Sequence, residues 1–108
     1  MKTLPSSIRV KKRYLRFKIE SAVLITRNDV IDAIFHAGRS LFGDHGISLI
    51  NMQLIDFDES SKTGIIRCNR DKVESVRAVI ATVSDIKGHP SAMRVLGVSG
   101  TIKGVRKK

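Results

Sequence analysis

The stretch YLRFKIES, from Tyr14 to Ser21, alternates apolar and polar residues along its whole length. A period of two predicts a β-strand with one buried face and one solvent-facing side. The apolar set that would face a core is Leu15, Phe17 and Ile19. The opposite set is Tyr14, Arg16, Lys18 and Glu20. This strand therefore predicts a sheet that is hydrophobic on one face and largely basic on the other.

The pattern next to this strand changes to the spacing of a helix over residues 28–44. Thr26 or Asn28 would cap its start, and Gly43 or Gly46 would end it. The later elements predicted in chain order are a strand over 47–57, a polar turn over 58–64, a strand over 65–69, a helix over 71–86, a break at 87–90 and a strand over 92–98.

The resulting order, βαββαβ, predicts an α+β fold of the ferredoxin-like (RRM-like) type. It would be a two-layer sandwich, with a four-stranded antiparallel sheet and two helices on one face. The first and third strands would lie centrally. We expect a single domain over residues 1–108, with a basic N-terminal arm (1–13) and a basic C-terminal tail (99–108). The fold alone decides no function.

Charge is distributed unevenly along the 108 residues, whose net charge is +10. All ten acidic residues lie between Glu20 and Asp85. Seven basic residues precede Glu20 and six follow Ile86, so both ends are purely basic. This arrangement is typical of a protein that binds a polyanion, most simply nucleic acid. Two solvated basic tails are the plainer interpretation.

The polar side of the sheet is the usual nucleic-acid platform of this fold. Arginine and lysine in place of aromatic residues favour contacts with phosphates over readout of bases. Merely solvated sheet residues are the alternative. The candidate RNA-binding residues are Arg9, Lys11, Lys12, Arg13, Tyr14, Arg16, Lys18, Arg67, Arg70, Ser99, Gly100, Lys103, Arg106 and Lys107.

The segment Gly97-Val98-Ser99-Gly100 resembles the GXXG loop of KH domains, but it follows a strand here. We expect Gly97 and Gly100 to permit a sharp turn, after which Ser99 or Thr101 caps a short basic helix. The N-terminus of that helix would either hold a phosphate or form a structural turn.

Signals for catalysis are weak. The three histidines are scattered, and no phosphate-binding loop or nucleophile motif is present. Asp56, Asp58 and Glu59 could hold a hydrated Mg²⁺, although a solvated turn is the simpler interpretation. An acylphosphatase-like enzyme would share this strand order, but the connection from Ala22 to Arg27 lacks the glycines of an anion-cradling loop. We expect no bound cofactor or metal and no catalytic residue.

Cys68, the single cysteine, is expected to be a small buried residue of a strand. No segment is apolar enough for a signal peptide or a membrane span, so a cytoplasmic protein is expected. The apolar sector of the first helix is unusually wide. Ile31, Phe35 and Phe42 therefore either meet a partner protein or lie under loops.

Three stretches, LPSSIRVKKRY (4–14), GIIRCNR (64–70) continuing to VESVR (73–77), and RVLGVSGTIK (94–103), also resemble one family. This is the family of protein component 2 of archaeal ribonuclease P, related to the eukaryotic Pop-five subunit. Many members continue into a longer C-terminal helix.

The resemblance implies a non-catalytic subunit that binds the catalytic domain of the ribonuclease P RNA. The RNA itself removes the 5′ leader of precursor tRNA with Mg²⁺. The resemblance also implies pairing with protein component 3, in a heterotetramer with two copies of each. A generic small RNA-binding or ribosomal protein is the runner-up.

Overall fold

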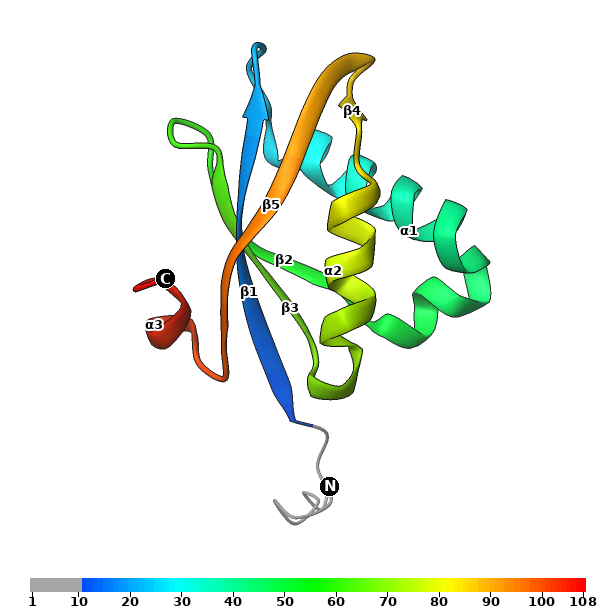
Figure 1. Cartoon of the computed structure of the whole chain (residues 1–108), viewed down its shortest axis with the longest axis vertical. Coiled ribbons are helices and arrows are strands. Elements are labelled where there is room, and N and C mark those ends of the chain that lie inside the picture. Colours follow the sequence, from blue (N-terminus) through cyan, green and yellow to red (C-terminus); the bar gives the residue numbers. More distant parts are fainter. Residues whose placement is uncertain (1–10) are drawn as a thin grey trace.

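The computed structural model describes residues 11–108, which form an α+β fold with an antiparallel sheet. The strands are arranged in the order β2-β3-β1-β5-β4 (Figure 1). The elements are β1 (Lys12–Ser21), α1 (Arg27–Ile50), β2 (Gln53–Asp58), β3 (Thr63–Asn69), a 3-10 turn η1 (Arg70–Lys72), α2 (Val73–Thr82), β4 (Asp85–Ile86), β5 (His89–Ser99) and α3 (Ile102–Val105).

β1 lies at the centre of the sheet and pairs antiparallel with β3 on one side and β5 on the other. Leu15, Phe17 and Ile19 are 0–1% exposed, so the predicted inward face of this strand is confirmed. On β3, Ile66 lies opposite Leu15 and is fully buried. The central placement of β1 and β3 is therefore confirmed, and the polar residues of β1 lie on the other face.

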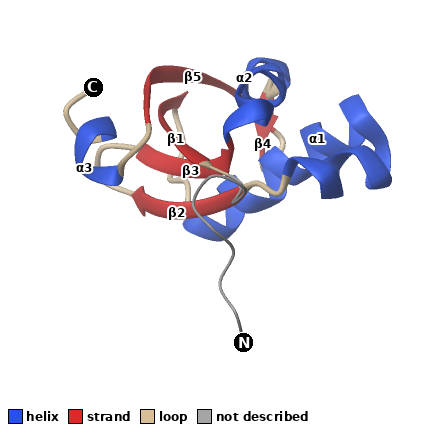
Figure 2. Ribbon diagram, turned by 90° about the horizontal axis from the view of Figure 1, so that it is seen from below, coloured by secondary structure: helices blue, strands red, loops and turns tan. Residues whose placement is uncertain are grey.

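The helices divide between the two faces of the sheet. α1 and α2 cover the face that carries Leu15 and Phe17, and their buried residues Val30, Ile34 and Val76 join the same core. The short α3 lies on the opposite side of the sheet (Figure 2). We call that opposite side the outer face. α3 packs there against β1 and β5.

α1 begins where predicted. Thr26 is its N-cap and forms a capping box with Asp29. Gly43 interrupts the helix with φ 76°, but the chain resumes a helical path to Ile50, and Asn51 then adopts a left-handed conformation. The predicted strand over 47–57 was therefore wrong over its first residues, since β2 begins only at Gln53.

The physical reason is packing across the kink. A Cβ on Gly38 would overlap the side chain of Ile47, so the segment after Gly43 folds back closely onto the one before it. Ile47 and Ile50 are thereby buried, at 9% and 3% exposure. A short apolar run with β-branched residues suggests a strand when only the sequence is considered. Here the two buried residues, Ile47 and Ile50, are three positions apart, which places them on the same face of a helical segment.

The second helix is shorter than predicted and the sheet has five strands, not four. α2 ends at Thr82, and Val83 is extended, with ψ 114°. Asp85 and Ile86 form the edge strand β4, which pairs with Pro90 and His89. The predicted break at 87–90 is a tight hairpin turn, in which Lys87 and Gly88 both have positive φ. The four-stranded ferredoxin-like layout was therefore not correct in this detail.

Gly64→Ala is expected to destabilise the domain by about 1–3 kcal/mol, the usual cost of overpacking. A Cβ at this position would lie 2.6 Å from Cζ of Phe17 and 2.7 Å from the backbone oxygen of Asp56, and neither group can move freely. Urea unfolding measures the loss. Ser61→Ala, in the exposed turn, is the control and should change the unfolding free energy by less than about 0.5 kcal/mol. Equal stability of the two variants would contradict this account of the packing.

Candidate nucleic-acid interface

The start of β1, the end of β3 and the end of β5 meet at one end of the sheet. Lys12 lies opposite Asn69, and Tyr14 lies opposite both Arg67 and Ser99. We call this region the basic end. It is made by Lys11, Lys12, Arg13, Arg67 and Arg70.

Hydrogen bonds fix the backbone and some of the side chains of the basic end. The Lys12 ammonium donates to Oδ1 of Asn69 at 2.7 Å, and the backbone N–H of Arg70 donates to the carbonyl of Lys11 at 2.8 Å. Nη1 of Arg13 donates to the carbonyl of Lys12 at 2.9 Å. Lys11 and Arg70 are exposed. These cationic groups can therefore meet phosphates with little rearrangement of the backbone.

The single tyrosine stands at the border of the basic end. Tyr14 is half-buried on the outer face, between Arg67 on β3 and Ser99 on β5. Arg67 in turn donates to the side-chain oxygen of Gln53. No other aromatic residue of the described strands faces this side of the sheet. Tyr14 is therefore the one aromatic side chain of these strands on which a base could stack.

α3 covers the middle of the outer face, which the strand pattern had predicted to be open. Val105 and Ile65 are 0% and 2% exposed, although neither belongs to the core under α1 and α2. Ile65 lies opposite Arg16 on this face. Nη1 of Arg16 donates to the carbonyl of Arg106 at 2.9 Å, and a Cβ on Gly97 would overlap Lys108. Arg16 thus helps to hold α3.

The outer face also carries acidic residues, of which Glu20 was expected from the alternation of β1 and Asp56 was not. Asp56 lies 3.7 Å from the guanidinium of Arg106, and Glu20 lies 3.2 Å from that of Arg94. Lys18 faces Arg94 at the end of β1 remote from the basic end. The predicted RNA-binding residues are therefore not one continuous patch. Lys18, Arg106 and Lys107 lie away from Lys11, Lys12 and Arg13, and Arg9 lies outside the described residues.

The glycine-rich tail follows the prediction in its capped helix but not in the role of Gly97. Gly97 lies within β5, where it allows the close approach of Lys108, and the glycines with positive φ in the described chain are Gly43 and Gly88. Thr101 is the N-cap of α3, and its hydroxyl accepts from the N–H of Gly104 at 2.9 Å. The short helix capped by Thr101 is therefore confirmed.

The described chain gives little support for a metal site at the β2–β3 turn or for an acylphosphatase-like enzyme. Residues 11–108 contain no cluster of three His, Cys, Asp or Glu side chains fit for a metal. Asp58 accepts from the backbone and hydroxyl of Ser60, as in a solvated turn. The Arg27 guanidinium donates to the carbonyl of Leu54. Cys68 is buried, as predicted, and burial raises the pKa of its thiol to about 11.

The predicted partner residues of α1 differ in exposure. Ile31 and Phe35 are half-buried and pack against the core, whereas Phe42 is 38% exposed. Among the helices of residues 11–108, none has the length and apolar character needed to cross a membrane.

Comparison with known proteins shows the family to which this chain belongs. A model of the Rpp14/Pop5 family matches residues 13–108, which is nearly the whole chain. The chain belongs to the Rpp14/Pop5 family. Relatives named ribonuclease P protein component 2 include one from Pyrococcus furiosus, which is 43% identical over 99% of this chain and 89% of its own length. Another, from Methanosarcina barkeri, is 40% identical over all of this chain and 78% of its own.

The Rpp14/Pop5 fold is also found in a solved complex. A chain of yeast ribonuclease MRP, seen by cryo-electron microscopy, matches with a TM-score of 0.72 and 18% identity. The match covers 94% of this chain and 79% of that one. At this identity the likeness shows the fold alone. The family recognised from three sequence stretches is thus confirmed.

Sequence reasoning missed two features of this Rpp14/Pop5 chain. One is the small apolar cluster of Ile65 and Val105 on the outer face. Ile65 was a signal for it, because this apolar residue occupies a position of β3 that the alternation assigns to the outer face. The other is Asn69, which orients Lys12. Nothing local in the sequence indicates that pairing, because the two residues are 57 positions apart.

Val105→Asp is expected to detach α3, since a buried carboxylate without a partner is costly. Limited trypsin digestion should then cut after Lys103 and Arg106 several times faster than in the parent protein. Lys107→Asp, on the exposed side of the tail, is the control and should leave the rate at Lys103 unchanged. If both variants were cut at the same rate as the parent, α3 would not be held by Val105.

Proposed function

We propose that this chain is a non-catalytic protein subunit of ribonuclease P that binds the catalytic domain of the ribonuclease P RNA through its basic end. The observation that carries this proposal is the meeting of Lys11, Lys12, Arg13, Arg67 and Arg70 at one end of the sheet. The names of the relatives support the assignment to ribonuclease P.

The proposed mechanism is electrostatic. Lysine and arginine side chains of the basic end neutralise phosphates that lie close together in the folded RNA, and so reduce their mutual repulsion. The RNA performs the cleavage that removes the 5′ leader of precursor tRNA, using its own Mg²⁺. The protein would lower the Mg²⁺ concentration that the RNA needs, and precursor tRNA would meet it only within the holoenzyme.

The protein partner in this proposal is ribonuclease P protein component 3, in a heterotetramer with two copies of each protein. The exposure of Phe42 on α1 supports an interface there. Ile31 and Phe35 would contribute at the edge of that interface, because both are only half-buried. We further propose that the complex works in the cytoplasm.

Two other functions remain as competitors. A generic small RNA-binding or ribosomal protein would show the same basic end, but the family match to residues 13–108 favours ribonuclease P. An acylphosphatase-like enzyme would need an anion-cradling loop between β1 and α1, and the connection over residues 22–27 contains no glycine. Turnover of an acyl phosphate by the purified protein, abolished by Arg27→Ala, would favour the enzyme.

Replacing Lys11, Lys12 and Arg13 with alanine should weaken binding to the ribonuclease P RNA. The slope of log affinity against log salt should also become shallower, by about 0.9 for every phosphate that the variant no longer neutralises. Filter binding at several salt concentrations measures both quantities. The control, with Arg39, Arg77 and Lys87 replaced by alanine, removes the same net charge from the helical side. If both triple variants bound equally, the basic end would not be the RNA site.

Reconstitution tests the assignment to ribonuclease P directly. We expect the RNA together with component 3 to cleave precursor tRNA faster at limiting Mg²⁺ when this chain is added. The increase in rate should disappear at high Mg²⁺, where counterions screen the phosphates without the protein. An equal amount of the Lys11, Lys12 and Arg13 alanine variant is the matched control. No increase with the parent chain at any Mg²⁺ concentration would refute the proposed function.

A further inference from the structure

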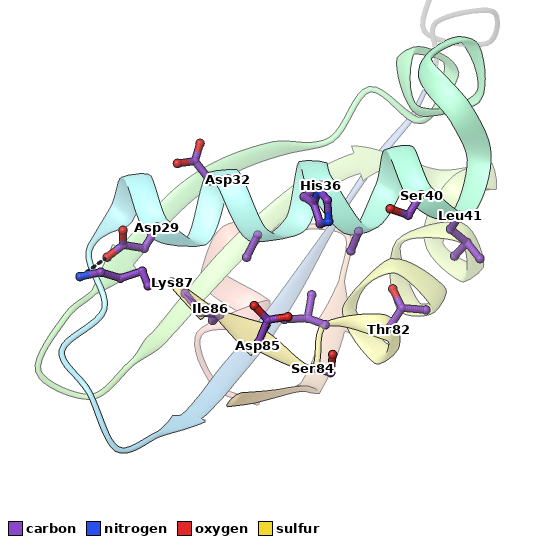
Figure 3. A pocket seen from close by; sticks show the side chains of 13 residues that line it. Asp29, Asp32, His36, Ser40, Leu41, Thr82, Ser84, Asp85, Ile86 and Lys87 are labelled. Atoms are coloured by element: carbon purple, nitrogen blue, oxygen red, sulfur yellow. Dashed lines mark ion pairs between the residues drawn. The ribbon is translucent and has the colours of Figure 1, made fainter. Parts of the chain in front are cut away.

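A groove of about 490 Å³ runs between α1 and the segment that connects α2 to the β4 hairpin (Figure 3). One wall is formed by the side of α1 from Asp29 to Leu41, and the other by residues 82–87. It lies on the helical side of the sheet, away from the basic end (Figure 1). The RNA-binding proposal makes no use of this groove.

The groove is elongated and partly apolar. Its α1 wall covers twelve residue steps, or about 18 Å of helix at 1.5 Å per residue. That wall combines the small residues Ala33, Ala37 and Ser40 with the larger Asp32, His36 and Leu41. Val83 and Ile86, which are 7% and 1% exposed, form the apolar part of the other side. This length suits about three turns of a helix or a short extended peptide better than a compact small molecule.

The groove is also acidic, although the chain as a whole carries a net charge of +10. Asp32 and Asp85 are exposed along its two walls, and within residues 11–108 neither forms an ion pair. Lys87 is engaged with Asp29, at 3.4 Å. α2 ends at Thr82 with no basic residue in its last turn, so the negative end of its dipole adds to the field.

An exposed apolar side chain lies at one end of the groove. Leu41 lines it and is 43% exposed. A partner that lay along the acidic walls would also reach Leu41. The groove thus offers carboxylates along its length and apolar surface at its end.

We propose that this groove binds a basic amphipathic segment of a protein partner, whose lysine or arginine side chains meet Asp32 and Asp85 and whose apolar side chains pack on Ala33, Ala37 and Leu41. Charge complementarity selects this occupant. A nucleic acid would be repelled by the same carboxylates. The inference is independent of RNA binding at the basic end, so each can fail alone.

A defined peptide tests the proposal without knowledge of the partner. The probe is an Ala-rich synthetic helix of about 15 residues with Lys and Leu along one face, and its control is the same peptide with Glu in place of Lys. Titration into ¹⁵N-labelled full-length protein should shift amide signals of residues 32–41 and 82–87 with the Lys peptide. The Glu peptide should leave those signals unchanged.

Asp32→Asn combined with Asp85→Asn should weaken binding of the Lys peptide by roughly tenfold, the combined effect of two exposed charge pairs. Asp29 is left intact because it belongs to the helix cap. The matched control is Asp44→Asn with Glu59→Gln, which removes two exposed carboxylates outside the groove and should leave the affinity unchanged.

Several results would overturn the proposal. These are no localised shifts with the Lys peptide, equally weakened binding in both double variants, or the same groove signals moving on addition of RNA. Groove signals that moved with protein concentration alone, together with a dimer in sedimentation, would instead assign the groove to a second copy of this chain. Failure here leaves the RNA titration of the basic end unaffected.

Discussion

Burial of one face of β1 is the interaction on which the rest of the structure depends. Leu15, Phe17 and Ile19 are almost completely removed from solvent, and each such side chain contributes about 1.5–3 kcal/mol when fully buried. Because side chains alternate along a strand, a shift of one residue would move all three to the outer face. Their burial thus fixes the register with β3 and β5 and the direction in which every polar residue of β1 points.

That register decides where charge is gathered. Residues far apart in the sequence, such as Lys12 and Asn69 or Tyr14 and Ser99, become neighbours only because β1 lies between β3 and β5. The same arrangement places Asp32 and Asp85 beside a groove on the helical side. The proposed RNA site and the proposed protein-binding groove therefore lie on different parts of the domain and differ in charge.

Much of this was predictable because local patterns agreed with the final packing. The alternation of β1, the capping box at Thr26 and the family-like stretches each carry their own signal. The errors have a common origin in tertiary packing. Ile47 and Ile50 were assigned to a strand because nothing local shows that the chain folds back after Gly43 onto Gly38. Likewise, Gly97 suggests a turn until Lys108 is seen to lie against it.

The family, the two-faced character of the central strand and the separation of basic ends from an acidic middle all follow from residue order. Periodicity and charge can be read without coordinates. The packing of distant segments set which basic residues share one end of the sheet, and it brought α3 over Arg16 and Ile65. It also decided that two aspartates 53 positions apart line one groove. These arrangements join distant segments, and their geometry depends on the packing of the whole chain.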